Sequence, residues 1–220
     1  MSDLAGFIEH TLLKPDCSLQ DVRKICAEAL QFNFAGVCIP PFFVRDAKRI
    51  IGDKAPVRVV TVVGFPMGYT AIAAKSEEIK RAVDEGADEI DAVLHIAAVK
   101  SDNWNHVQHD IEGIVRATHL RGRSSKLILE CGLLTEAEIR RVVDIAKLAG
   151  IHYLKTGTGF HGFPATEEMV RLLKSLAGAD MKVKAAGGIR TRETARAMLE
   201  AGADRLGTSV GPALVAETGK

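Results

Sequence analysis

Two lysines stand on neighbouring apolar segments, and each segment runs directly into a glycine-rich turn. Lys155 precedes Thr156-Gly157-Thr158-Gly159, and Lys184 precedes Ala185-Ala186-Gly187-Gly188. A lysine ammonium is costly to bury, so apolar strands normally exclude it. Where one is kept, burial and a second nearby cation lower its pKa and expose a nucleophilic amine, which is the chemistry of an imine-forming lysine. Two edge lysines reaching solvent are the commoner arrangement in an arbitrary chain, so the surroundings must decide.

An aspartate on another apolar segment is the natural partner for these lysines. Asp91 lies between Ile90 and Ala92 in the run 89–96. Side chains alternate along a strand, so Asp91 faces away from these two neighbours and shares its face with His95. An inward carboxylate in an apolar strand needs a cationic partner. A structural salt bridge is the alternative, but two lysines on inward faces favour a catalytic role.

Glycine-rich turns after the last three apolar segments predict a phosphate pocket. They are Thr158-Gly159, Gly187-Gly188-Ile189 and Gly207-Thr208-Ser209. Glycines let backbone N–H groups approach an anion closely, and barrels often hold phosphate at the loops after strands 7 and 8. A single turn of this kind is weak evidence, but three on consecutive strands beside two lysines indicate an anion site.

The elements that must position these residues form a repeated pattern of helix, glycine and short apolar strand. Glycine just past a helix end supplies a left-handed C-cap, and Ser or Thr with acids in the first turn marks helix starts. Eight strands are predicted, at 7–12, 36–39, 57–63, 89–96, 127–130, 153–156, 183–186 and 205–208. Eight βα units in one domain, residues 1–220, fit a (β/α)8 TIM barrel. An open doubly wound sheet would be expected to carry a nucleotide fingerprint after its first strand, and none is present.

The composition of the chain limits the kinds of partner that we expect it to bind. Apolar residues make up 47% and charged residues 26%, with a net charge of +1, so we expect neither nucleic acid nor a membrane as a partner. Four cysteines without a C-x-x-C spacing and a start without a secretory signal predict reduced thiols in a cytoplasmic protein. Histidines and acids show no metal-ligand spacing, and imine chemistry needs no metal, so no cofactor is expected.

The motifs together resemble deoxyribose-phosphate aldolase, a class I aldolase of the DeoC type. The resemblance runs from about residue 7 to 210, in the family's order, and is carried by Asp91, the two lysine runs and Gly207-Thr208-Ser209, with 10–15 and 62–68. It implies reversible cleavage of 2-deoxy-D-ribose 5-phosphate to D-glyceraldehyde 3-phosphate and acetaldehyde. Small phosphosugars and aldehydes would be its partners, in a homodimer or homotetramer.

The resemblance also implies a role for individual residues. Lys155 matches the lysine that forms the Schiff base, Lys184 the second lysine that makes it easier to deprotonate, and Asp91 the carboxylate of the proton relay. Substrate contacts are implied for Cys38, for Thr11 and Thr158 near the sugar hydroxyls, and for Gly159, Gly187, Gly188 and Ser209 in the phosphate pocket.

Several positions depart from the family's usual pattern. Gly157 replaces a serine, Glu9 an aspartate and His95 a frequent asparagine, and the segment 40–43 is bulkier. These changes affect the pocket's shape and so the aldehyde specificity. The alternatives are another imine-forming phosphosugar aldolase or transaldolase, and a phosphosugar-binding barrel without catalysis.

Two further features receive structural interpretations. Glu130 is expected to pair with Lys126 rather than to join the site. His161 and Phe163 lie in a loop that would be able to close over a substrate, although an ordinary loop role is the commoner one.

Overall fold

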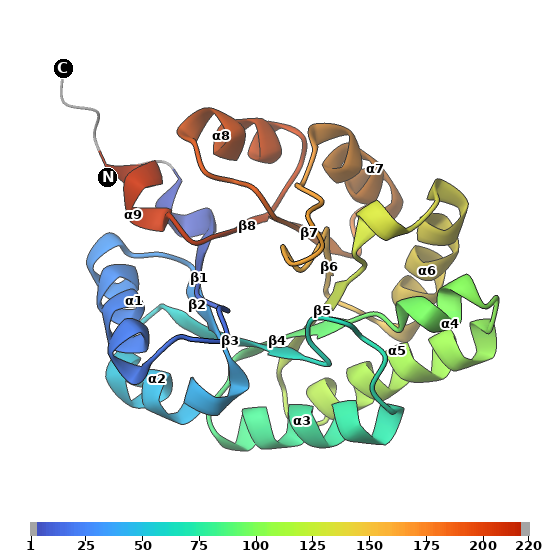
Figure 1. Ribbon diagram of the computed structural model, residues 1–220, viewed down its shortest axis with the longest axis horizontal. Helices are drawn as coiled ribbons and strands as arrows, with labels where there is room; N and C mark the ends of the chain where they lie inside the picture. Colours follow the sequence, from blue (N-terminus) through green and yellow to red (C-terminus); the bar gives the residue numbers. More distant parts are fainter. Residues whose placement is uncertain (1–3, 217–220) are drawn as a thin grey trace.

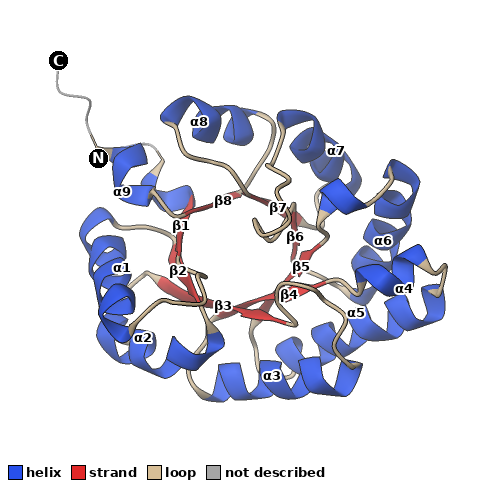
Figure 2. Ribbon diagram, in the orientation of Figure 1, coloured by secondary structure: helices blue, strands red, loops and turns tan. Residues whose placement is uncertain are grey.

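A computed structural model describes residues 4–216, and its eight parallel strands close into a barrel in the order β1 to β8. Helices surround the barrel on the outside, as Figures 1 and 2 show in a view down the barrel. The predicted (β/α)8 barrel is therefore confirmed. The strands are β1 Ile8–Thr11, β2 Gly36–Ile39, β3 Arg58–Val63, β4 Glu89–Val93, β5 Ser124–Ile128, β6 Tyr153–Lys155, β7 Lys182–Ala186 and β8 Arg205–Thr208.

The outer layer consists of helices whose apolar sides pack on the strands. They are α1 Leu19–Phe32, α2 Val44–Ile51, α3 Ile72–Asp84, α4 Ile96–Lys100, α5 Trp104–His119, α6 Glu136–Ala149, α7 Glu167–Ala177, α8 Arg192–Glu200 and α9 Gly211–Val215. Short 3-10 helices cover Ala5–Phe7, Pro41–Phe43 and Cys131–Leu133. The main core lies between the two layers, and Val22, Ile90, Val142 and Leu154 are among its fully buried members.

The helix starts follow the predicted capping chemistry. Ser18 and Thr135 form reciprocal capping boxes with Asp21 and Glu138. Thr166 likewise accepts a hydrogen bond from the first turn of α7. A side-chain oxygen at the N-cap satisfies one of the N–H groups that have no partner within the helix. Each cap therefore fixes where the chain leaves a strand-to-helix loop, and so the shape of the loops around the barrel mouth.

Two strand boundaries differ from the prediction by three residues, and the others by two at most. β5 begins at Ser124, three residues earlier than expected. The strand begins with two serines, so the apolar pattern did not predict its first residues. Lys126, which follows them, is nevertheless buried inside the barrel. β4 ends at Val93, and His95 lies beyond it, where its Nδ1 accepts a hydrogen bond from Ala98 N at 3.1 Å. The expectation that His95 shares the inward face of Asp91 was therefore wrong, because His95 caps α4.

Candidate active site

Four strands direct charged side chains into the centre of the barrel. Asp91 on β4, Lys126 on β5, Lys155 on β6 and Lys184 on β7 are all almost completely buried. Asp91 Oδ2 accepts hydrogen bonds from Lys155 Nζ at 2.9 Å and from Lys184 Nζ at 2.7 Å. Asp91 Oδ1 accepts one from Lys126 Nζ at 2.9 Å. The predicted meeting of Asp91 with the two lysines is thus present, with a third lysine beside them.

Two glutamates complete this inner cluster, which comprises Glu9, Glu89, Asp91, Lys126, Lys155 and Lys184. Lys126 Nζ lies 2.5 Å from Glu89 Oε2 and 3.4 Å from Glu9 Oε1, and Lys184 Nζ donates to Glu9 Oε2. The sequence analysis considered Lys126 only as a partner of Glu130 and Glu9 only as a departure from the family's pattern. The signal lay in strand pairing, because Asp91 on β4 stands opposite Lys126 on β5 in the sheet register.

Mutual pairing keeps Asp91, Lys126 and Lys184 ionised despite their burial. Burial opposes the charge on Asp91, but Lys126, Lys155 and Lys184 outweigh it and hold the pKa of Asp91 well below its usual range. Burial likewise disfavours the charge on Lys126 and Lys184. The surrounding carboxylates, Asp91 foremost, outweigh it and raise the pKa of both lysines above the usual range. Both lysines therefore remain cations that donate to Asp91.

One lysine of the inner cluster opens onto a cavity. A pocket of about 420 Å³ at the carboxyl ends of the strands is lined by Lys155. In the part of the chain that the structure describes, neither Lys126 nor Lys184 belongs to its lining. Lys155 is thus the inner-cluster amine that a molecule in this pocket would meet.

The pocket also gathers the predicted substrate contacts from several strands. Its lining includes the three glycine-rich turns after β6, β7 and β8, together with the end of β1. The predicted contacts in this lining are Thr11, Thr158, Gly159, Gly187, Gly188 and Ser209. Backbone conformation explains the glycines, since Gly188 has φ of +73° and a Cβ there would lie 2.9 Å from Pro164 Cβ. Arg190 adds a cationic side chain to the same lining.

Cys38 occupies a different position from the other predicted contacts. It is fully buried on β2, in a small apolar group with Val60 and Val62 against which Leu13 and Phe65 pack. Burial raises the pKa of its thiol, and the charges of the inner cluster act on it. Cys38 does not line the pocket in the part of the chain described, so a contact with substrate stays a prediction.

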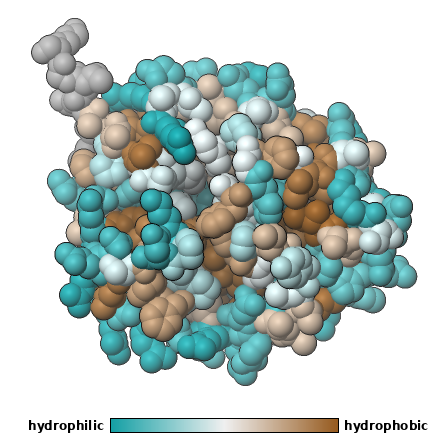
Figure 3. Space-filling model, in the orientation of Figure 1, coloured by the Kyte–Doolittle hydropathy of each residue, from teal (hydrophilic) through white to brown (hydrophobic). Residues whose placement is uncertain are grey.

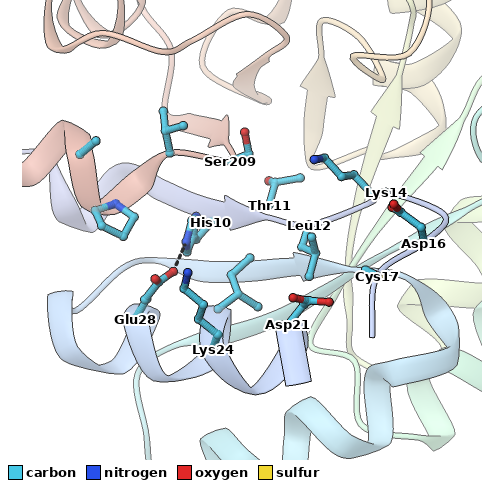
Figure 4. Close-up of a pocket in the computed structure, with 14 residues that line it drawn as sticks. His10, Thr11, Leu12, Lys14, Asp16, Cys17, Asp21, Lys24, Glu28 and Ser209 are labelled. Carbon is cyan, nitrogen blue, oxygen red and sulfur yellow. Dashed lines mark hydrogen bonds and ion pairs between the residues drawn. The ribbon is translucent and has the colours of Figure 1, made fainter. Parts of the chain in front are cut away.

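A second cavity lies beside the first, between α1 and the segment after β8. It measures about 590 Å³ and shares Thr11, Leu12, Lys14 and Ser209 with the pocket of Lys155. Figure 4 shows this cavity, with the side chain of His10 directed at Glu28. His10 Nε2 lies 2.8 Å from Glu28 Oε2. His10 therefore ties β1 to α1, on the side of the strand opposite to Glu9.

The loop between β6 and α7 lies over the mouth of the barrel in Figure 1. The space-filling view in Figure 3 shows apolar patches on this face interleaved with hydrophilic residues. Phe160 and Phe163 in this loop are among the exposed apolar residues. Phe160 meets Phe65 from the loop after β3 in an edge-to-face contact, with ring centroids 5.1 Å apart. The two loops thus approach each other above the pocket.

The predicted pairing of Glu130 with Lys126 was wrong. Lys126 is engaged by the inner cluster, whereas Glu130 Oε2 accepts hydrogen bonds from Thr158 N at 3.0 Å and His161 Nδ1 at 2.9 Å. Glu130 therefore holds the β6–α7 loop. Among residues 4–216, no group of three or more His, Cys, Asp or Glu side chains is arranged to hold a metal ion, and metal independence stays a prediction.

A closed (β/α)8 barrel with a buried lysine opening into a glycine-lined pocket has the architecture of a lysine-dependent barrel aldolase. The family model described as DeoC/LacD family aldolase matches residues 4–215, and the chain belongs to this family. The resemblance predicted from the motifs is therefore confirmed.

Curated relatives cover nearly the whole chain. A deoxyribose-phosphate aldolase from Desulfitobacterium hafniense is 48% identical over 213 residues, which are 97% of each chain. One from Thermococcus gammatolerans is 45% identical over 214 residues, 97% of this chain and 95% of the relative. Among solved structures, an aldolase called QR15 superposes with a TM-score of 0.91 at 39% identity, covering 98% of this chain and 95% of QR15.

A further solved structure bears on assembly. The deoxyribose phosphate aldolase from Aeropyrum pernix, described as having a unique tetrameric structure, has a TM-score of 0.89 to this chain at 32% identity. The match covers 97% of this chain and 89% of that one. None of the helices within residues 4–216 is both long and apolar enough to cross a membrane.

Proposed function

We propose that this chain is a class I aldolase that reversibly cleaves 2-deoxy-D-ribose 5-phosphate to D-glyceraldehyde 3-phosphate and acetaldehyde. The observation that carries the proposal is Lys155, a buried amine that opens onto a pocket lined by three glycine-rich turns. Membership of the aldolase family and the close curated deoxyribose-phosphate aldolases support the reaction and the substrate.

In the first step Lys155 attacks the C1 aldehyde of the open-chain sugar. Its ammonium must lose a proton, and it already donates to Asp91 Oδ2 at 2.9 Å. Lys184 donates to the same oxygen at 2.7 Å and is itself protonated, so Asp91 would take the proton of Lys155 and pass it on to a water. The carbinolamine then loses water and becomes a protonated imine. Lys155 is the proposed nucleophile, and Asp91 and Lys184 form the proposed proton relay.

The carbon–carbon bond that breaks is C2–C3, because acetaldehyde takes two of the five carbons. The hydroxyl on C3 loses its proton to a base, and the electron pair of the C2–C3 bond moves into the protonated imine. This releases glyceraldehyde 3-phosphate and leaves an enamine on Lys155. Protonation at C2 and hydrolysis by water free acetaldehyde and restore the amine. Each step is reversible, so the same groups would also form the bond.

The phosphate of the substrate is proposed to lie among the turns after β6, β7 and β8. Gly159, Gly187, Gly188 and Ser209 would offer backbone and hydroxyl donors, and Arg190 a positive charge. Thr11 and Thr158 line the same pocket and would contact the sugar hydroxyls. Binding the phosphate at these turns would hold the chain of the sugar between them and Lys155.

We further propose that residues 1–220 form a single domain that assembles as a homodimer or homotetramer in the cytoplasm. The tetrameric relative from Aeropyrum pernix supports assembly. Light scattering coupled to size-exclusion chromatography would measure the number of chains directly.

Borohydride trapping tests the proposed chemistry. The protein is incubated with acetaldehyde and sodium borohydride, which reduces an imine to a stable ethyl group on the lysine. Peptide mass spectrometry should then find that group on Lys155, and treatment with EDTA should not prevent it. A label on Lys184 with Lys155 unmodified would contradict the assignment. A panel of other phosphosugars distinguishes this reaction from that of another aldolase or a transaldolase.

A further inference from the structure

Glu130 has a backbone conformation that its residue type rarely adopts. It follows β5 with φ of 54° and ψ of 57°, in the left-handed region. Within residues 4–216 the other non-glycine residues with positive φ are Asn33 and Asp102, whose short polar side chains tolerate this region. A glutamate lacks that advantage, and such strain persists only where the surrounding structure fixes it. The conformation of Glu130 therefore calls for a cause in its contacts.

The contacts of Glu130 lie in the loop that follows the proposed nucleophile. Its side chain is 1% exposed. Oε2 accepts hydrogen bonds from Thr158 N at 3.0 Å, from Thr158 Oγ1 and from His161 Nδ1 at 2.9 Å. The other oxygen lies against Gly157, where a Cβ would be 2.7 Å from Oε1. The strained backbone thus places a buried carboxylate against three residues of the β6–α7 loop.

This arrangement determines which hydrogen bonds Thr158 can still make. A hydroxyl has one hydrogen and two acceptor positions. Thr158 gives its hydrogen to Glu130 Oε2. One acceptor position is taken by Phe160 N, 3.1 Å away. Thr158 lines the pocket of Lys155, so it can meet a ligand there only as an acceptor.

His161 supports the same carboxylate from the outer side. Its side chain is 21% exposed. Its Nδ1 gives its hydrogen to the nearer Glu130 Oε2, at 2.9 Å, and not to Thr158 Oγ1 at 3.3 Å, so the second acceptor position of Thr158 stays open. A hydrogen bond to a charged carboxylate is about twice as strong as a neutral one. His161 therefore fixes where the carboxylate lies, and the carboxylate fixes where Thr158 lies.

We propose that Glu130 and His161 are positioning residues that set the sugar-binding side of the pocket, with Thr158 held as an acceptor for a hydroxyl of the substrate. The proposal rests on the proposed aldolase function and deepens it, since it assigns a basis for preferring hydroxylated substrates. Neither residue takes part in imine formation. Their effect falls on the five-carbon sugar and spares acetaldehyde, which has no hydroxyl to donate.

The test compares four variants in two assays. His161→Ala removes the donor to Glu130, whereas His161→Asn keeps an N–H near the position of Nδ1. Glu130→Gln keeps the size of the side chain but turns one acceptor into a donor. His109→Ala, at an exposed histidine of α5, is the matched control. The assays are the kcat and KM for cleavage of 2-deoxyribose 5-phosphate and the rate of borohydride trapping with acetaldehyde.

In His161→Ala we expect KM for the sugar phosphate to rise about tenfold, the usual effect of losing one charge-assisted hydrogen bond. Acetaldehyde trapping should stay within about twofold, because no hydroxyl contact is involved. His161→Asn should recover most of the KM, and His109→Ala should match the unsubstituted protein. Glu130→Gln should raise KM, and the double variant with His161→Ala should cost no more than the larger single change, because both act through one contact.

The outcomes separate this inference from the proposed function. An unchanged KM in His161→Ala, or an asparagine variant no better than alanine, overturns the positioning role. Equal losses in KM and in acetaldehyde trapping also overturn it, since the effect would then lie on the chemistry or the fold. Failure of the unsubstituted protein to trap acetaldehyde at all would instead overturn the proposed function, and this inference with it.

Discussion

Buried lysines meet carboxylates in two regions of this molecule, inside the barrel and between two outer helices. In the inner cluster Lys184 donates to Asp91 and Glu9. Outside the barrel Lys75 of α3 donates to Asp110 Oδ2 of α5 at 2.6 Å. We call Lys75 and Asp110 the outer pair, and both side chains are as deeply buried as those of the inner cluster.

The two regions differ in the direction of their pKa shifts. Burial lowers the pKa of Lys75 and raises that of Asp110, and their mutual attraction only partly offsets it. In the inner cluster the pKa of Lys184 is raised and that of Asp91 is held well below its usual range. The number of partners explains the difference. Asp91 has three ammonium groups around it, whereas Asp110 has one, and Asp110 Oδ1 has no hydrogen-bond partner.

The difference teaches that a close contact alone does not keep a buried pair charged. Burial costs each ion its solvation free energy, and attraction to a single counterion offsets that cost only in part. Several counterions in one barrel keep the charges that the proposed proton relay needs. The outer pair serves another purpose, because Lys75 Nζ also donates to Val93 O at 2.8 Å. It therefore anchors the end of β4, the strand that carries Asp91.

The same substitution should lower activity far more in the inner cluster than in the outer pair. Lys155→Met should lower kcat/KM for 2-deoxyribose 5-phosphate by about a thousandfold or more, because no other amine of the inner cluster lines the described pocket. Lys75→Met should keep activity within about tenfold, since Lys75 does not belong to the described lining of the pocket. Steady-state assays on both purified variants measure this. Equal losses would mean that the two regions are not functionally distinct.

For the free energy of unfolding, Lys75→Met should have the larger effect and Lys155→Met the smaller one. Lys75→Met leaves Asp110 buried without its cation, which typically costs about 3–5 kcal/mol. Lys155→Met should cost much less, because Asp91 keeps Lys126 and Lys184. Urea unfolding measures both, and the double variant Lys75→Met/Asp110→Leu should regain much of the loss. A double variant as unstable as Lys75→Met would show that burial of the charge is not the cause.

Sequence patterns predicted the residues whose neighbours are apolar and missed those set among polar ones. Lys155, Lys184 and Asp91 stand out because alternation places a charge within an apolar strand. Lys126 follows Ser124 and Ser125, and this polar run is typical of the end of a loop. Only the closed barrel and its register put Lys126 opposite Asp91.

The sequence did not predict the burial of Lys75, for a similar reason. It belongs to a helix rich in charged residues, beside Ser76, Glu77 and Glu78, where a lysine normally faces solvent. Its burial depends on how α3 packs on α5, which no local period encodes. The sequence did not predict the strained backbone of Glu130 either, because Thr158, in the loop that Glu130 holds, lies 28 residues further along the chain.

Replacing Asp91 or Asp110 by asparagine removes a charge and little else, and so tests the difference between the inner cluster and the outer pair. Asp91→Asn should lower kcat/KM about a hundredfold, a usual effect of losing one member of a proton relay. Asp110→Asn should change it by less than about threefold, because Asp110 contacts Lys75 and not the pocket. The measurement is steady-state cleavage at neutral pH. A larger loss in Asp110→Asn would mean that anchoring β4 matters more than the charge of Asp91.

The smallest effect should be a difference in how stability depends on pH. The pKa of Asp91 is lower in the folded protein than in the unfolded chain, so its contribution is present above about pH 3.9 and is lost as the pH falls through the folded value. The pKa of Asp110 is raised. Between about pH 3.9 and its folded pKa, the folded state holds a proton that the unfolded chain has released, so its contribution weakens as the pH rises.

The two asparagine variants should therefore bend the pH profile in opposite directions. Asp91→Asn should flatten the loss of stability in acid, because the group that must be protonated there is gone. Asp110→Asn should instead remove a contribution that declines with rising pH, and so make stability increase more steeply from pH 4 upward. Each pKa unit of difference corresponds to about 1.4 kcal/mol. Thermal unfolding midpoints measured from pH 3 to pH 8 would reveal these slopes, and parallel profiles for the two variants would contradict the opposite ionisation behaviour of the two regions.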